Sequence, residues 1–159
     1  MDNIMKRFVH IPVFVFLLLS ITVLAQEKER EKFDPTRDAA KDIENAITRA
    51  TKLNKKILLD VGGEWCIWCH RLDEFILADK EIDSTLHANF VVVKVNYSKE
   101  NKNDMVLANY PKVAGYPHFF VLEKDGSLLL SKNTGELEQE KSYSKEKLLS
   151  FFNVWKTKK

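Results

Sequence analysis

Two cysteines have the residue type and spacing for redox chemistry. Cys66 and Cys69 stand three positions apart in the segment WCIWCH, and the chain has no other cysteine. An apolar run and two glycines precede them, and apolar residues follow at helical spacing, so we expect the pair where a strand turns into a helix. Unpaired backbone N–H groups and the helix dipole favour a thiolate at such a helix start. The spacing predicts that the Cys66 thiolate attacks a partner disulfide and that Cys69 resolves the mixed disulfide.

The amino-terminal residues have the order of a secretory signal. Two basic residues precede an apolar run over residues 11–24, and small or aliphatic residues come just before a candidate cut after residue 25. This order predicts a signal peptide over residues 1–25. Because the run is shorter than the ~20 residues of a spanning helix, we expect cleavage and no stable membrane insertion, rather than an uncleaved anchor. Without a KDEL-like ending, a bacterial periplasm or the cell exterior is the expected location of the exported chain.

Export would affect how the cysteine pair is interpreted, because it determines the redox conditions around the thiols. It would place both thiols in an oxidising compartment, where disulfides form and persist. A disulfide across two intervening residues closes a very short loop and restricts the unfolded chain little. A disulfide that stabilises the fold so little, in an oxidising compartment, indicates a cysteine pair that is present for its redox chemistry.

Composition and charge describe one compact domain. The chain has 159 residues, 45% of them hydrophobic, and ten Phe, which suits one well-packed core. Its formal net charge of +2 is near neutral, and the clustered basic face of a nucleic-acid-binding protein is not expected. The run QEKEREK predicts a charged, solvated linker over residues 26–33, and residues 34–159 form the predicted domain.

The pattern of the domain predicts an α/β fold. Strands that run parallel come first and a hairpin at Asp125-Gly126 comes late, which favours a mixed central sheet flanked by helices. The predicted elements are a helix over 35–53 capped by Asp34, a buried strand over 56–61, a helix from the cysteine motif onward, a short helix capped by Asp79, a strand over 90–97, a helix over 101–110, strands over 118–122 and 128–131, a polar loop over 136–142, and a last helix capped by Ser144.

Several stretches together resemble the thioredoxins. ILLDVGGEWCIWC is similar to their active-site segment, VVVKVN to their central strand, VAGYP to the loop that carries their cis-proline, and HFFVLEKDG to the strand and turn after it. The similarity covers roughly residues 35–155. The extra N-terminal helix and the W-C-x-W-C-H form look closest to exported thioredoxin-like proteins, including the C-terminal domain of the DsbD reductase. The resemblance implies a thioredoxin fold with an extra N-terminal helix.

The resemblance also implies roles for single residues. Asp60 would be a buried carboxylate with a raised pKa that exchanges a proton with Cys69. Lys94 would be its charge partner, although a solvated strand lysine is an open alternative. Pro117 would be cis, and the backbone of Tyr116 would pair with a substrate strand beside the cysteines.

Four more side chains are candidates for substrate contact or for tuning the thiolate. Trp65 and Trp68 are expected to pack and to line the substrate surface. His70 and His118 would tune the thiolate, because imidazole titrates near neutral pH. Plain exposure at the surface is the alternative for both histidines.

Two alternatives use the same residues for a cofactor or a metal. Cys66, Cys69 and His70 also match C-x-x-C-H, the attachment motif of c-type haem, with His70 as axial ligand. The strand before the motif and the proline loop after it oppose haem, and a Soret band would decide. Zinc held by the cysteines and two of His70, His87 and His118 lacks a recognised ligand spacing. We therefore expect neither a metal nor a cofactor.

The remaining alternatives concern catalysis and its direction. A thioredoxin-fold binding module without catalysis is opposed by the intact cysteines and by Asp60. Asp60 favours a reductase or isomerase over an oxidase, but Ile-Trp stands between the cysteines where thioredoxins have Gly-Pro, and in that family this dipeptide tunes the potential. The expected substrates are disulfides or thiols of proteins, and the expected electron source is an upstream redox partner such as a membrane reductase.

Overall fold

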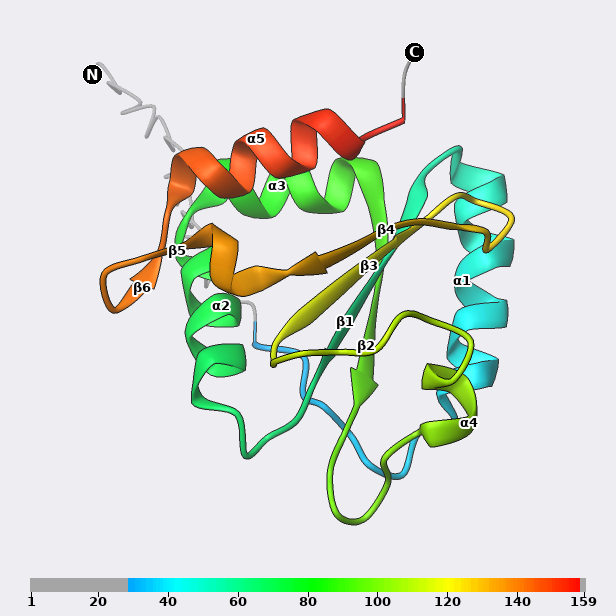
Figure 1. Ribbon diagram of the computed structural model, residues 1–159. Coiled ribbons are helices and arrows are strands. Elements are labelled where there is room, and N and C mark those ends of the chain that lie inside the picture. Colours follow the sequence, from blue (N-terminus) through cyan, green and yellow to red (C-terminus); the bar gives the residue numbers. More distant parts are fainter. Residues whose placement is uncertain (1–28, 158–159) are drawn as a thin grey trace, which may run out of the picture.

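Figure 1 shows the computed structural model of the chain, which describes residues 29–157. The predicted signal peptide over residues 1–25 and residues 26–28 of the predicted linker lie outside this range. The described elements are α1 Ala39–Leu53, β1 Lys56–Gly62, α2 Ile67–Ala78, α3 Lys80–Asn89, β2 Phe90–Asn96, α4 Asp104–Leu107, β3 His118–Leu122, β4 Leu128–Asn133, a 3-10 helix Thr134–Leu137, β5 Glu138–Gln139, β6 Ser142–Tyr143 and α5 Lys145–Trp155.

A mixed four-stranded sheet forms the centre of the domain. The strand order is β2-β1-β3-β4, with β1 parallel to β2 and antiparallel to β3, and with β4 antiparallel to β3. Figure 1 shows α1 on one side of this sheet and α2, α3 and α5 on the other. The predicted α/β class, with a mixed sheet flanked by helices and an additional N-terminal helix, is confirmed.

Alternation along β1 divides the core into two layers. Successive side chains of a strand point to opposite faces of the sheet. Ile57, Leu59 and Val61 pack with α1, whereas Leu58 packs with α2, α3 and α5. Asp60 follows the parity of Leu58, so it points to the face that α2 covers.

The first predicted helix starts later than expected. Asp38, rather than Asp34, caps α1, and its carboxylate accepts hydrogen bonds from the backbone N–H groups of Ala40 and Lys41. The Asp34 carboxylate accepts instead from the N–H and the hydroxyl of Thr36, which forms a separate turn. Two aspartates four positions apart compete to cap the helix, and the sequence pattern favoured the wrong one.

Two further predictions of secondary structure need correction. The helix expected over 101–110 is reduced to α4, because asparagine side chains bind the backbone before it: the Asn103 N–H donates to the side chain of Asn101, and the Asn96 side chain donates to the Asn101 carbonyl. The loop expected over 136–142 is ordered, with a 3-10 helix and the β5–β6 hairpin. The predicted caps Asp79 and Ser144 are confirmed at α3 and α5.

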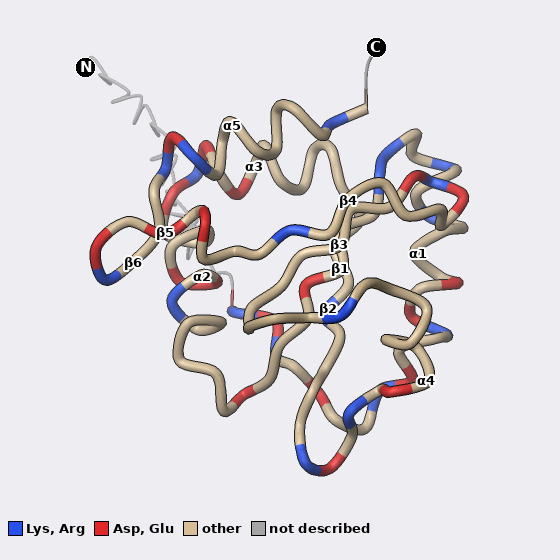
Figure 2. Tube along the Cα trace, viewed as in Figure 1, with Lys and Arg blue, Asp and Glu red and all other residues tan. Residues whose placement is uncertain are grey.

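The described residues contain no helix that is both long and apolar enough to cross a membrane. Figure 2 shows that charged residues lie mostly on the helices and loops, and that few lie on the central strands. A charged pair in the middle of the sheet is therefore an exception that calls for an explanation.

Candidate active site

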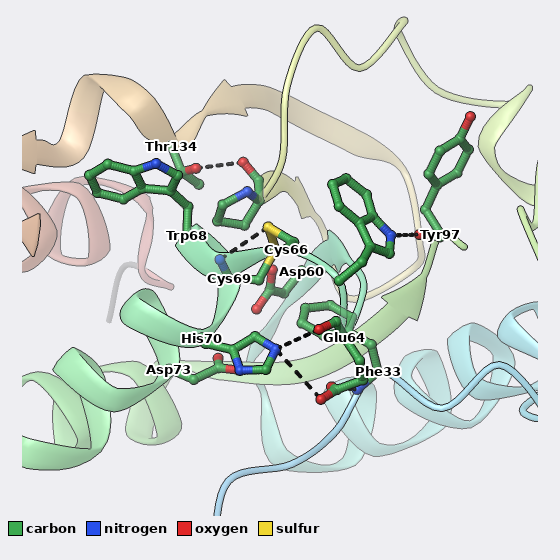
Figure 3. Close-up of a disulfide and its surroundings, with 12 residues drawn as sticks. Phe33, Asp60, Glu64, Cys66, Trp68, Cys69, His70, Asp73, Tyr97 and Thr134 are labelled. Carbon is green, nitrogen blue, oxygen red and sulfur yellow. Dashed lines mark hydrogen bonds and ion pairs between the residues drawn. A yellow bond between two sulfur atoms is a disulfide. The ribbon is translucent and has the colours of Figure 1, made fainter. Parts of the chain in front are cut away.

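The cysteine pair lies where β1 turns into α2. Cys66 is the N-cap of α2, with φ −93° and ψ 101°, and its Sγ accepts a hydrogen bond of 3.1 Å from the N–H of Cys69 (Figure 3). A disulfide joins the two residues, whose Cα atoms are 5.2 Å apart. Cys66 is 4% exposed and Cys69 is 1% exposed, so the pair is nearly covered. The predicted placement of Cys66 at a helix start, with Cys69 one turn deeper, is confirmed.

Gly62, at the end of β1, gives the disulfide its space. A Cβ at this position would lie 2.6 Å from Cys69 Sγ and 2.9 Å from Cζ of Phe33. Phe33 is 1% exposed and packs against Cys66 and Cys69. The glycine therefore allows both a sulfur and an aromatic ring to approach the strand closely.

Beneath the disulfide, Asp60 and Lys94 form a buried ion pair. They are register partners on β1 and β2, and Lys94 Nζ lies 2.6 Å from Asp60 Oδ2, with both side chains at most 7% exposed. Burial raises the pKa of Asp60 to about 6, against the opposing charge of Lys94. Burial also disfavours the charge of Lys94, but the adjacent carboxylates outweigh it and raise the pKa of Lys94. The predicted contact is present, and the solvated alternative for Lys94 is wrong.

Lys94 has a second carboxylate partner that the sequence analysis did not identify. Its Nζ also donates to Asp73 Oδ1, on α2, and the Asp73 side chain is only 8% exposed. Asp73 follows Cys69 by four positions, so it lies on the same side of the helix one turn later. That spacing was the available signal. This spacing predicts a buried Asp73 only when a buried cation is already known to lie beside the helix.

Aromatic rings form a wall on the solvent side of Cys66. The Tyr116–Pro117 peptide bond is cis, as predicted. Trp65 is 60% exposed, and its Nε1 donates to the backbone carbonyl of Tyr97 at 2.7 Å. Tyr116 meets the Trp65 ring edge-on at 5.6 Å between centroids and stacks on Tyr97 at 4.9 Å. Trp65 and Tyr116 thus form an aromatic surface next to the cis bond, and Tyr116 packs against the cysteine pair.

Trp68, labelled in Figure 3, packs against the cysteine pair and against the core layer that α2, α3 and α5 cover. Its ring meets Tyr143 edge-on at 5.9 Å, and the Arg71 guanidinium lies 4.6 Å from its centroid. The Tyr143 hydroxyl donates to the Trp68 carbonyl at 3.3 Å. Trp68 therefore anchors the first turn of α2 to the β5–β6 hairpin, and only part of its surface is free for a substrate.

The histidines near the motif are both engaged. His70 Nε2 lies 3.0 Å from the Glu64 carbonyl oxygen and 3.6 Å from a Glu64 carboxylate oxygen. His118 is 4% exposed, and its Nε2 lies 2.8 Å from the Ser131 hydroxyl. Burial lowers the pKa of His118. The alternative of an exposed surface histidine is therefore wrong for His118, while His70 stays next to the motif.

The zinc alternative also involves His87, which does not belong to the cysteine motif. His87 is on α3, where its ring contacts Asp83. Among residues 29–157, no three His, Cys, Asp or Glu side chains are grouped in a way that could hold a metal ion.

The end of the expected linker is packed on this site. Arg30 makes a two-pronged ion pair with Glu64, with N···O distances of 3.0 and 2.5 Å, and also approaches Asp73 at 3.4 Å. The N–H of Phe33 donates to the same Glu64 carboxylate at 2.8 Å. Arg30 and Phe33 are therefore packed on the domain, whereas Glu29, Glu31 and Lys32 are exposed. The sequence pattern missed this packing because a charged run normally lies in solvent.

Comparisons with solved structures agree with this fold. The disulphide isomerase from Xylella fastidiosa superposes with a TM-score of 0.67 at 25% identity, covering 77% of this chain and 94% of that chain. The oxidised C-terminal domain of DsbD from Neisseria meningitidis superposes with a TM-score of 0.56 at 19% identity, covering 75% and 97%. The predicted thioredoxin fold is confirmed.

Sequence comparisons reach the same family. Spermatogenesis-associated protein 20 from Rattus norvegicus is 36% identical over 67 residues, 42% of this chain and 8% of that protein. Thiol:disulfide interchange protein DsbD from Vibrio cholerae is 26% identical over 99 residues, 62% of this chain and 16% of that protein. The chain thus spans a small part of these longer relatives. Residues 43–146 match the thioredoxin-like domain family. The chain belongs to the thioredoxin-like family, and its two cysteines form a disulfide at the start of α2.

Proposed function

We propose that the chain is an exported enzyme that exchanges thiols and disulfides with other proteins, and that it acts as a reductase or isomerase. One observation carries this proposal. The Cys66–Cys69 disulfide caps a helix between the cis Tyr116–Pro117 bond and the buried Asp60–Lys94 pair. A substrate strand has a place on one side of the sulfurs, and a proton acceptor lies on the other.

The proposed cycle starts from the reduced pair. The Cys66 thiolate attacks one sulfur of a substrate disulfide, and the other substrate sulfur leaves as a thiolate that takes a proton from solvent. Asp60 accepts the proton of Cys69, whose thiolate then attacks Cys66 Sγ. The mixed disulfide breaks, the second substrate sulfur leaves as a thiolate that takes a proton from solvent, and the Cys66–Cys69 disulfide forms. Two electrons have passed to the substrate.

The environment of Asp60 supports the reducing direction. A carboxyl group with a pKa of about 6 can accept a proton and return it near neutral pH. The oxidised pair must then be reduced again, so the proposal includes an upstream electron donor, such as a membrane reductase. Residues 1–25, the proposed signal peptide, would bring the chain to a bacterial periplasm or the cell exterior.

The test is catalysed reduction of insulin by dithiothreitol, followed by equilibration of the pair with glutathione. We expect turnover above background and a potential near that of thioredoxin, about −270 mV, rather than near −120 mV. Cys66→Ser is the inactive control. Turnover equal to that control would contradict the enzyme, a potential near −120 mV would contradict the direction, and a Soret band would indicate haem instead.

A further inference from the structure

Residues 29–33 cross the base of the active site and contact three of its parts. Arg30 pairs with Glu64, which precedes the cysteine motif, and with Asp73 on α2. The Phe33 N–H donates to Glu64, and the Phe33 ring packs against both cysteines. We call residues 29–33 the strap. Its polar contacts join the start of the motif to the helix that follows it.

The strap completes an alternating row of charges. From the surface inward, this row contains Glu64, Arg30, Asp73, Lys94 and Asp60, and each pair of neighbours is in direct contact. The side-chain exposure falls from 40% at Glu64 to 18% at Arg30 and 5% at Asp60. Charges that are removed from water interact strongly, so a change at Arg30 is transmitted inward.

The strap also covers the space beside the buried carboxylates. Residues 29–31 line a cavity of about 100 Å³ together with Asp60, Asp73 and Lys94. Phe33 lies over Lys94, whose Nζ is 4.4 Å from the ring centroid. Asp60 Oδ1 is buried and has no hydrogen-bond partner among the described residues. The depth of this carboxylate in the protein thus depends in part on residues that precede the first helix.

We propose that the strap is a working part of the active site, in which Arg30 and Phe33 are positioning residues that hold the charges under the disulfide in place. The inference rests on the proposed thiol chemistry and goes beyond it by assigning a role to the end of the expected linker. Arg30 neutralises Glu64 and Asp73, so their negative charge does not oppose the Cys66 thiolate. Phe33 separates Lys94 and the sulfurs from water.

The direction of the effect follows from the charges that face the pair. The charged or titratable groups that face the pair come from the strap, from β1 and β2, and from the segment between Glu64 and Asp73. They are Arg30, Glu31, Asp60, Glu64, His70, Asp73 and Lys94. Loss of the Arg30 charge leaves Glu64 without its arginine partner and leaves Lys94 as the cation beside Asp73, so the negative charge near the thiols is less compensated. A thiolate next to uncompensated negative charge is less stable, so its pKa rises.

The experiment compares Arg30→Gln with Arg37→Gln. Both changes remove one positive charge, but Arg37 pairs with Asp42 and Glu31 instead of Glu64 and Asp73. In a Cys69→Ser background, the pH dependence of Cys66 alkylation by iodoacetamide reports the thiolate directly. We expect Arg30→Gln to slow alkylation at pH 7 on the order of threefold or more. Arg37→Gln should change the rate much less, because its strap partner Glu31 is 54% exposed.

Two further variants separate charge from folding. Arg30→Gln combined with Glu64→Gln removes both charges of the outer pair and should restore much of the alkylation rate, whereas a merely unfolded strap would not be rescued. Phe33→Leu should change the rate less than Phe33→Ala, because leucine still excludes water. Equal rates in Arg30→Gln and Arg37→Gln, or faster alkylation in Arg30→Gln, would overturn the proposal.

This readout does not depend on a protein substrate. If the wild-type chain failed to reduce insulin but Arg30→Gln still shifted the alkylation profile, the proposed role of the strap would be supported and the proposed enzyme activity would be contradicted. If insulin were reduced normally and Arg30→Gln did not shift the alkylation profile, the enzyme activity would be supported and the role of the strap would be contradicted.

Discussion

The two sides of the disulfide are built from different chemistry. On the solvent side, Trp65 and Tyr116 offer aromatic surface beside the cis bond to Pro117, and Trp65 is 60% exposed. On the inner side, Asp60 and Lys94 are charged and almost completely covered. Side chains on the outer side can contact different molecules without disturbing the core, whereas the side chains on the inner side are packed within the core. In the proposed enzyme, substrate recognition and proton transfer are thus separated by one pair of sulfurs.

The largest effect is expected at the sulfurs, where the two sides meet. Cys66→Ser should abolish turnover, because no thiolate then faces the aromatic wall. Cys69→Ser should instead accumulate mixed disulfides with partner proteins, since the resolving thiol on the inner side is gone. Non-reducing gels of each variant, incubated with periplasmic protein, measure this. Trapping by Cys66→Ser alone would reverse the two roles.

Asp60→Asn tests the inner side through stability. A pKa of about 6 in the folded protein, against an ordinary 3.8, means that ionised Asp60 lowers the free energy of unfolding by up to about 3 kcal/mol. The penalty is absent below about pH 4, grows as the pH rises to 6, and persists above it. Asp60→Asn should therefore stabilise the protein at pH 7.5 and not at pH 3.5, measured by urea unfolding. Turnover should fall on the order of 100-fold.

Two glycines compare the packing of the sides directly. At Gly62 a Cβ would meet Cys69 Sγ and Phe33, whereas at Gly115, on the proline loop, it would meet nothing within 4 Å. Gly62→Ala should cost about 1–3 kcal/mol of unfolding free energy, as overpacking does. Gly115→Ala should change it by less than about 0.5 kcal/mol. If urea unfolding showed similar losses of unfolding free energy for both variants, the inner side would not be more tightly packed than the outer side.

The smallest effect is expected on the outer side. Trp65→Ala should raise the KM for a protein substrate on the order of fivefold, because an exposed aromatic anchor is lost. It should leave the pH profile of Cys66 alkylation in place. Val154→Ala, on α5, is the control, because Val154 is 66% exposed and belongs to neither side. A shift in the alkylation profile of Trp65→Ala would show that the two sides are coupled.

Much of the fold followed from local patterns. Apolar runs with branched residues marked β1, β2 and β3, and the caps Asp79 and Ser144 marked two helix starts. The start of α1 was misplaced, because two aspartates can both accept backbone N–H groups and only tertiary packing selects one. Asn103, with φ 49°, delays the start of the helix predicted over 101–110, and its N–H donates to the Asn101 side chain, an interaction that periodicity does not reveal.

The site was predictable where its parts follow from the cysteine motif or, as for Lys94 and Pro117, from the resemblance. Cys66, Cys69 and Asp60 lie within one strand-turn-helix segment, so their spacing describes them. Arg30 contacts residues 34 and 43 positions away, and nothing in a charged run distinguishes a half-buried, paired arginine from a solvated one. The resemblance to thioredoxins could not help there, because the similarity begins near residue 35.

The buried carboxylate of β1 has a consequence for thermal adaptation. Most substitutions that raise heat resistance are easy to find and cost little unless they remove a strained functional group. A screen of variants for survival at high temperature alone should therefore recover replacements of Asp60 among its first hits, and these survivors would be poor catalysts. Heat resistance and activity would have to be selected together for this position to persist.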